Sequence, residues 1–104
     1  MTIYALSTGS GIAGIAVIRV SGKNTVNVIK RITGNKLPSP RVATLTKFNK
    51  NGTKELIDEG VIIWFPAPNS YTGEDLAEFH VHGSRAVISA LHKALSQIKN
   101  CRLA

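Results

Sequence analysis

The sequence of 104 residues contains one cysteine and no long run of apolar residues. Cys101 has no partner for a disulfide within the chain, so the sequence does not fit the small disulfide-stabilised secreted domains and fits a reducing cytoplasm. No apolar run approaches the roughly 20 residues that span a bilayer. The first ten residues lack both the basic start and the apolar stretch of a secretory signal. We therefore expect a cytoplasmic protein with no membrane segment, in which Cys101 is a structural thiol.

Acidic residues are absent from the first half of the chain. Residues 1–54 hold nine Lys or Arg and no Asp or Glu, residues 55–78 hold six acids and no base, and the net charge is +7. Such segregation can mark a nucleic-acid surface with a separate acidic site. Isolated lysines are more often simply solvated, and no aromatic residues alternate with them to stack bases. A basic nucleic-acid-binding module is therefore one candidate function.

Three glycines near the N-terminus spell the spacing G-x-G-x-x-G. The dinucleotide fingerprint needs a helix after Gly14 and an acid about 20 residues further on. The residues that follow are β-branched, as in a buried strand, and the first acid is Glu55. The glycines also lack the Gly-Lys-Ser/Thr ending of a phosphate-binding loop. We interpret Gly9, Gly11 and Gly14 as a turn between two strands.

Hydrophobic periodicity predicts an α+β domain over residues 1–104, with a mixed, mainly antiparallel sheet and two principal helices. The first helix places Val26, Val28, Ile29 and Ile32 roughly on one face and ends at Gly34. Ser84 is the predicted N-cap of the second helix. The apolar stripe of that second helix consists of Val87, Ile88, Leu91, Leu95 and Ile98.

The strands are predicted from short β-branched or alternating runs. Asn51-Gly52 is a hairpin turn signal, and the segment 66–70 contains two prolines that exclude it from a sheet interior. Residues 61–65 either continue the strand that contains Leu56 and Ile57 or form a further one. The predicted strands are 3–6, 15–21, 41–48, the strand after the Asn51-Gly52 turn, 75–82 and one that begins at 101. We expect the domain to be truncated at its C-terminal end, because the chain stops where this last strand begins.

The densest polar cluster lies in the predicted strand 75–82. Period two places Leu76, Glu78, His80 and His82 on one face and the apolar Ala77, Phe79 and Val81 on the core side. A His-x-His pair could present two imidazoles to a metal ion, but two histidines and one glutamate are a weak signal. The alternative is that His80 is an exposed strand residue and His82 a hydrogen-bonded strand end.

No other pattern in the chain predicts catalysis. Cys101 has no local acid–base partner and no Gly-x-Ser-x-Gly elbow occurs. Glu74 and Asp75 are expected to be solvated, and His92 is expected to face solvent on the last helix. We therefore expect no catalytic residue and no metal ligand in this chain.

Three segments resemble the N-terminal domain of the tRNA-modification GTPase family known as MnmE or TrmE. They are residues 15–22 (IAVIRVSG), 64–75 (WFPAPNSYTGED) and 78–83 (EFHVHG). The second segment is long and specific, and the resemblance runs from Ile3 nearly to the end of the chain. It implies a fold like the folate-binding domain of the glycine-cleavage aminomethyltransferase.

The resemblance further implies a homodimer that binds a tetrahydrofolate one-carbon derivative, 5-formyl- or 5,10-methylene-tetrahydrofolate. The full enzyme, with a flavoprotein partner, modifies C5 of the wobble uridine in tRNA. Its GTPase domain, with GTP, Mg²⁺ and K⁺, would lie beyond Ala104, so this domain alone lacks the GTPase site. The alternative remains a basic nucleic-acid-binding module without a folate site.

The family's folate contacts within this chain map onto Arg19 and Glu78. An ionised carboxylate can accept the adjacent N3–H and 2-amino groups of a pterin ring. A guanidinium on an otherwise apolar strand needs an anion or a carbonyl, and folate offers both. The alternative for both residues is a salt bridge, for Arg19 to an acid in residues 74–78.

Overall fold

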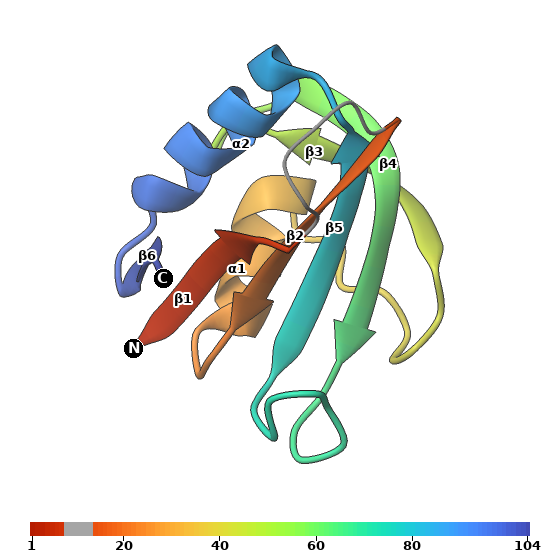
Figure 1. The fold of residues 1–104 in the computed structure, drawn as a ribbon, viewed down its shortest axis with the longest axis vertical. Coiled ribbons are helices and arrows are strands. Elements are labelled where there is room, and N and C mark those ends of the chain that lie inside the picture. Colours follow the sequence, from red (N-terminus) through yellow and green to blue (C-terminus); the bar gives the residue numbers. More distant parts are fainter. Residues whose placement is uncertain (8–13) are drawn as a thin grey trace.

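A computed structural model of the chain describes residues 1–7 and 14–104. In this part of the chain, two helices cover one face of a six-stranded sheet (Figure 1). The elements are β1 (Thr2–Leu6), β2 (Ile15–Ser21), α1 (Thr25–Thr33), β3 (Thr44–Asn49), β4 (Leu56–Phe65), β5 (Leu76–His82), α2 (Arg85–Ser96) and β6 (Cys101–Leu103). The predicted α+β class is confirmed. The predicted glycine turn falls largely on residues 8–13, outside the described residues.

The strands follow the order β3-β4-β5-β2-β1-β6 across the sheet. All neighbours are antiparallel except β1 and β6, which are parallel, so the sheet is mixed and mainly antiparallel as predicted. The pairing of Thr2 with Cys101 places the first and last strands side by side.

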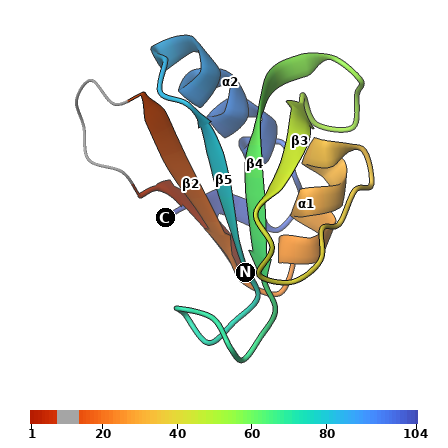
Figure 2. The same cartoon turned by 90° about the vertical axis from the view of Figure 1, so that its right-hand side faces the viewer.

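The core lies between the sheet and the helices. Figure 2 shows α1 and α2 on the same side of β2 and β5. Alternate strand residues point to this side because successive side chains of a strand face opposite ways, and Phe48 of β3 meets Phe79 of β5 with ring centroids 5.2 Å apart. The helices contribute apolar residues that are fully buried, namely Val28, Ile29, Ile32, Leu91 and Leu95.

The end of α1 and the start of α2 lie where the sequence predicts, but α2 ends at Ser96, so Ile98 of the predicted stripe is buried just beyond the helix rather than on it. Gly34 adopts the left-handed conformation (φ 70°) at the end of α1, and its N–H donates to the carbonyl of Lys30. The Ser84 Oγ accepts a hydrogen bond of 3.1 Å from the N–H of Val87 at the start of α2. Within the described residues, neither helix has the length and apolar character needed to cross a bilayer.

The strands differ from the prediction mainly at β3, and β4 decides an alternative that the sequence left open. β3 begins at Thr44 rather than at residue 41, because Arg41 lies in the left-handed region (φ 64°) and donates its N–H to the carbonyl of Trp64. The apolar residues 61–65 are the continuation of β4 and not a further strand. Gly60 lies in this long strand where a methyl group would stand only 2.1 Å from the carbonyl oxygen of His80.

Candidate functional site

The face of the sheet opposite the helices carries the charged residues of β2 and β5. Arg19 pairs directly with Glu78 in the register of these antiparallel strands, and Val17 pairs with His80. Glu78 and His80 in turn pair with Ile63 and Val61 of β4. Because directly paired residues share a face, these side chains form adjacent cross-strand rows. We call this side of the sheet the open face.

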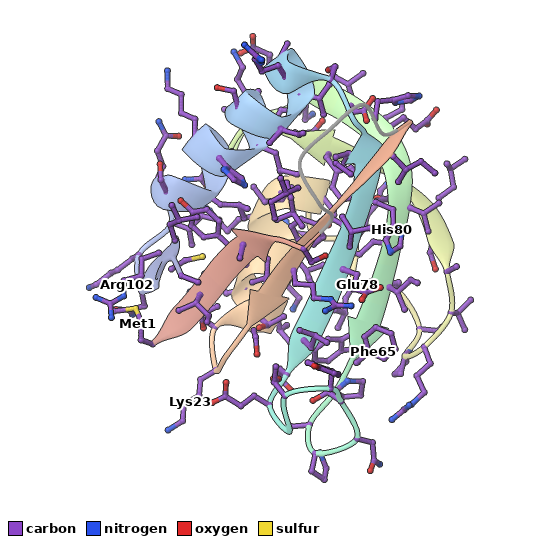
Figure 3. All side chains as sticks on the ribbon, viewed as in Figure 1. Met1, Lys23, Phe65, Glu78, His80 and Arg102 are labelled. Atoms are coloured by element: carbon purple, nitrogen blue, oxygen red, sulfur yellow. The ribbon has the colours of Figure 1, made fainter. Side chains whose placement is uncertain are left out.

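Arg19, Glu78 and His80 form a hydrogen-bonded chain on the open face. The Arg19 Nε donates to one Glu78 carboxylate oxygen at 3.0 Å, and the His80 Nε2 lies 3.1 Å from the other. The Glu78 side chain is 16% exposed, against 43% for Arg19 and 28% for His80. Figure 3 shows Glu78 and His80 on the same strand, with Phe65 of β4 nearby. The structure thus brings together Arg19 and Glu78, the two predicted site residues.

The carboxylate of Glu78 is held in its ionised form. Burial by itself raises its pKa, but hydrogen bonds from His80 and Arg19 and the positive charge of Arg19 outweigh burial, so the pKa lies below its ordinary value. Arg19 uses Nε for this contact, which leaves its terminal nitrogens without a hydrogen bond to the described residues. The pair can therefore accept N–H groups at the carboxylate and donate to an oxygen at the guanidinium.

Tyr71 lies beside the pair, on the loop between β4 and β5. Its ring centroid is 5.4 Å from the Arg19 Cζ, and the side chain is 85% exposed. The loop is tied to the sheet by a 2.8 Å hydrogen bond between Ser21 Oγ and Thr72 Oγ1. The Asp75 carboxylate accepts the N–H of Ala67 at 2.8 Å, so Asp75 is engaged within the loop rather than only solvated.

A second contact between a carboxylate and a histidine joins β4 and β5, from Asp58 to His82 at the end of β5. The His82 Nδ1 lies 2.9 and 3.0 Å from the two Asp58 oxygens, and the backbone N–H of His82 donates to Asp58 at 2.8 Å. Burial raises the pKa of Asp58, but the bonds from His82 outweigh it and the pKa is lowered. Among the described residues, no cluster of three or more His, Cys, Asp or Glu could hold a metal ion. The two histidines of the His-x-His pair instead contact different carboxylates.

The prediction for His92 is wrong. Its ring packs edge-on against Tyr4 of β1, with centroids 5.5 Å apart, and its Nε2 is buried with no hydrogen-bond partner in the described part of the chain. Burial lowers the pKa of His92. Tyr4 lies in β1, at the start of the chain. The contact between His92 and Tyr4 therefore cannot be predicted from the spacing of apolar residues within α2. Cys101 is buried, as expected for a structural thiol, and burial raises the pKa of its thiol.

Sequence reasoning missed the contributions of Tyr71 and β4 to the site. Period two within β5 does place His80 beside Glu78, so their hydrogen bond had a signal in the sequence. The position of Tyr71 over Arg19 had no signal in the sequence. The two residues are far apart in the chain, and the loop that carries Tyr71 has no periodic pattern. Ile63 of β4 lies beside Glu78 only because of the register between β4 and β5, which the sequence does not specify.

Comparisons with known proteins agree on one family. The model of the family described as GTP-binding protein TrmE N-terminus matches residues 2–104. The chain is 70% identical over 104 residues to the tRNA modification GTPase MnmE of Pelagibacter ubique, covering 100% of the chain and 24% of that protein. It is 50% identical over 103 residues to the protein of the same name from Parvibaculum lavamentivorans, covering 99% and 24%.

A mitochondrial relative extends the similarity beyond bacteria. The chain is 48% identical over 101 residues to the 5-taurinomethyluridine-[tRNA] synthase subunit GTPB3 of Danio rerio, covering 97% of the chain and 20% of that protein. The chain thus spans between a fifth and a quarter of the length of these relatives.

Proposed function

The chain belongs to the family of TrmE N-terminal domains, and we propose that it binds a tetrahydrofolate one-carbon carrier and forms a homodimer within a tRNA-modifying GTPase. The observation that carries the ligand assignment is the Arg19–Glu78 pair on the open face. The resemblance names the two residues, and the strand register supports the proposal because it pairs Arg19 directly with Glu78.

The chemistry of the pair suits a pterin ring. Glu78 is ionised, so it can accept the adjacent N3–H and 2-amino groups, and charge-assisted hydrogen bonds of this kind are the stronger ones. The free nitrogens of Arg19 can donate to the ring oxygen or to the carboxylates of the folate tail. Phe65 and Tyr71 offer aromatic surface beside the pair. These residues therefore suit the proposed ligand in charge and in hydrogen-bonding groups.

A structural ion pair would have the same geometry, and a binding measurement separates the two. We expect saturable binding of 5-formyl-tetrahydrofolate in isothermal titration calorimetry, and its loss in Glu78→Gln, which removes the charge while keeping the size. Glu59→Gln removes an exposed carboxylate from the neighbouring strand and serves as the matched control. Saturable binding that survives Glu78→Gln would contradict the assignment.

The open face also supports the proposed homodimer. It exposes large apolar side chains that the helices do not cover, among them Ile3 and Ile15. These two residues lie near opposite ends of β2, and large apolar side chains left exposed on a sheet face are candidates for burial in an interface. Sedimentation equilibrium should give twice the 11.2 kDa mass of the chain. A mass of 11.2 kDa at every concentration tested would contradict the homodimer.

We propose the remaining activities for the larger protein, since its relatives are four to five times as long as this chain. There, the GTPase domain with GTP, Mg²⁺ and K⁺ and a flavoprotein partner would modify C5 of the wobble uridine with the carbon carried by folate. The full-length protein with Glu78→Gln should fail to restore the modified uridine in cells that lack the enzyme, while Glu59→Gln should restore it. Equal restoration by both variants would contradict a role of this site in the modification.

A further inference from the structure

Two hollows lie on the helix side of the molecule, one on each side of the turn between β3 and β4. The first has a volume of about 280 Å³ and opens between this turn and α2, with Lys50 and Lys93 in its lining. The second has a volume of about 340 Å³ and opens between the turn and the end of α1, with Lys30, Arg31 and Lys54 in its lining. Thr53 lines both, so the hollows are neighbours and together form one surface. We call it the helix-side basic surface.

Positive charge on this surface is almost unopposed. Among the described residues that line the two hollows, none is acidic. Glu55 is the nearby acid that forms an ion pair here, at 2.9 Å from the Lys50 Nζ. Lys30, Lys54 and Lys93 are exposed, and their ammonium groups make no hydrogen bond or ion pair with the described residues. Three ammonium groups are therefore free to meet an external anion.

One cation of the surface is held in place by the turn. The Arg31 Nε donates to the Asn51 Oδ1 at 2.9 Å, and the Arg31 carbonyl accepts the N–H of Gly52. The guanidinium lies so close to Gly52 that a methyl group there would be 2.7 Å from an Arg31 terminal nitrogen. Its terminal nitrogens carry no further bond to the described residues. An arginine fixed in this way loses little conformational entropy when it binds a phosphate.

We infer that the helix-side basic surface binds the phosphate backbone of RNA, an inference that rests on the proposed role in tRNA modification. Phosphate contacts come from Lys, Arg and small polar side chains, and the hollows add the hydroxyl of Thr53 and the amides of Asn35 and Gln97. The surface carries no aromatic side chain in its lining, which suits contact with a backbone rather than stacking on bases. The sheet separates the helix-side basic surface from the open face, so RNA and the folate carrier would not compete for one site.

The test compares two triple variants that remove the same charge from different places. Lys30→Gln/Lys54→Gln/Lys93→Gln removes the three unpaired ammonium groups of the helix-side basic surface without breaking a hydrogen bond or ion pair among the described residues. Lys23→Gln/Lys99→Gln/Arg102→Gln removes three exposed cations near the chain ends, where Figure 3 shows Lys23 and Arg102 beside Met1. Fluorescence anisotropy with labelled tRNA, repeated from low to moderate salt, gives the affinity and its salt dependence for each.

We expect the first variant to bind tRNA more weakly by about tenfold or more, with the slope of log K against log salt falling by roughly 2 to 3, and the control to change far less. Equal weakening of both would mean that only net charge matters and would overturn the inference, as would the absence of tRNA binding by the unaltered protein. Unchanged binding by the first variant would also overturn it, and would leave the hollows to an acidic protein partner.

Two further measurements keep the result interpretable. Far-ultraviolet circular dichroism checks that both triple variants fold, and Lys54→Gln alone repeats the test with a single exposed change. Folate titration on the same variants separates this inference from the proposed function. If the first triple variant binds folate and also binds tRNA as tightly as the unaltered protein, only the assignment of the basic surface is wrong. If the unaltered protein does not bind folate, the proposed ligand is wrong.

Discussion

Along β5 the two faces of the sheet alternate residue by residue. Ala77, Phe79 and Val81 point into the helix layer and are at most 2% exposed, whereas Glu78 and His80 lie between them on the open face and keep contact with water. The helix-covered residues are apolar and packed on one another, so their contribution is to stability. The open-face residues are charged and only partly covered, so they can exchange their contacts for those of a ligand. One strand thus combines a folding surface and a binding surface.

The largest effect should come from the helix-covered face. Phe79→Ala removes a fully buried ring that packs on Phe48, and we expect it to lower the free energy of unfolding by about 3–5 kcal/mol. Leu45→Ala, at a strand position that is 70% exposed, should change it by less than about 0.5 kcal/mol. Urea denaturation measures both. Similar losses for the two variants would abolish the contrast between the faces.

A smaller loss of stability is expected at Gly60, where β4 packs closely against the backbone of β5. Gly60→Ala would place a methyl group against the carbonyl oxygen of His80, so β4 and β5 must move apart. We expect a loss of about 1–3 kcal/mol, as for other overpacked sites, together with weaker folate binding because His80 carries the contact to Glu78. Gly14→Ala is the matched control, since among the described residues no atom beyond its chain neighbours lies within 4 Å of the added carbon. A fully stable Gly60→Ala would show that the strands yield easily there.

The two faces should also lose stability at different pH values. Burial lowers the pKa of His92, beside the helix layer, below its ordinary 6.5. The unfolded chain therefore takes up this proton first, and the contribution of the neutral ring is present above about pH 6.5 and lost as the pH falls through the folded pKa. The pKa values of Asp58 and of the open-face Glu78 lie below their ordinary 3.8 and 4.5, so the stability that these carboxylates contribute is lost only below about pH 4.5.

Substitutions at the two faces separate these windows. His92→Leu should raise stability at pH 5.5 by about 1 kcal/mol, because it removes a buried nitrogen without a partner, and should flatten the decline between pH 7 and 5.5. Asp58→Asn should leave that decline in place and reduce the one below pH 4.5. Urea midpoints at pH 7, 5.5 and 3.5 give the comparison. A midpoint for His92→Leu that falls with pH like that of the unaltered protein would contradict the assignment.

The smallest effect on stability should come from Tyr71, which is exposed above the open face. Tyr71→Ala should change the free energy of unfolding by less than about 0.5 kcal/mol. Loss of the ring beside Arg19 should weaken folate binding by about two- to fivefold, corresponding to an exposed cation–π contact. Tyr71→Phe keeps the ring and should preserve both values. A large loss of stability in Tyr71→Ala would mean that the loop is part of the core.

Local patterns predicted the elements well, and they failed where distant segments meet. Strand β2 has the predicted bounds, and the alternation along β5 identified its buried face, because period two is a property of the backbone itself. The start of β3 was wrong because Arg41 adopts a left-handed conformation stabilised by a bond to Trp64, which is far along the chain. The environment of His92 failed for the same kind of reason, since Tyr4 belongs to the first strand.

The candidate site shows the same division. The resemblance supplied Arg19 and Glu78, and the alternation supplied the neighbouring position of His80. Neither specifies that β2 and β5 pair so that Arg19 lies directly opposite Glu78, because a shift of one residue would send the two side chains to different faces. The register is set by the whole apolar face beneath. The folding surface therefore determines the geometry of the binding surface.

The parallel pairing of β1 with β6 bears on how the molecule is made on the ribosome. Strand β1 precedes every other described strand in the sequence, yet one of its hydrogen-bonding edges is covered by Cys101–Leu103 of β6, which is the last of these strands to be synthesised. Until then the nascent chain carries an uncapped strand edge, the feature most prone to pair with another polypeptide. Pairing of this edge of β1 thus waits for the three residues of β6, so deleting these residues should favour aggregation during synthesis.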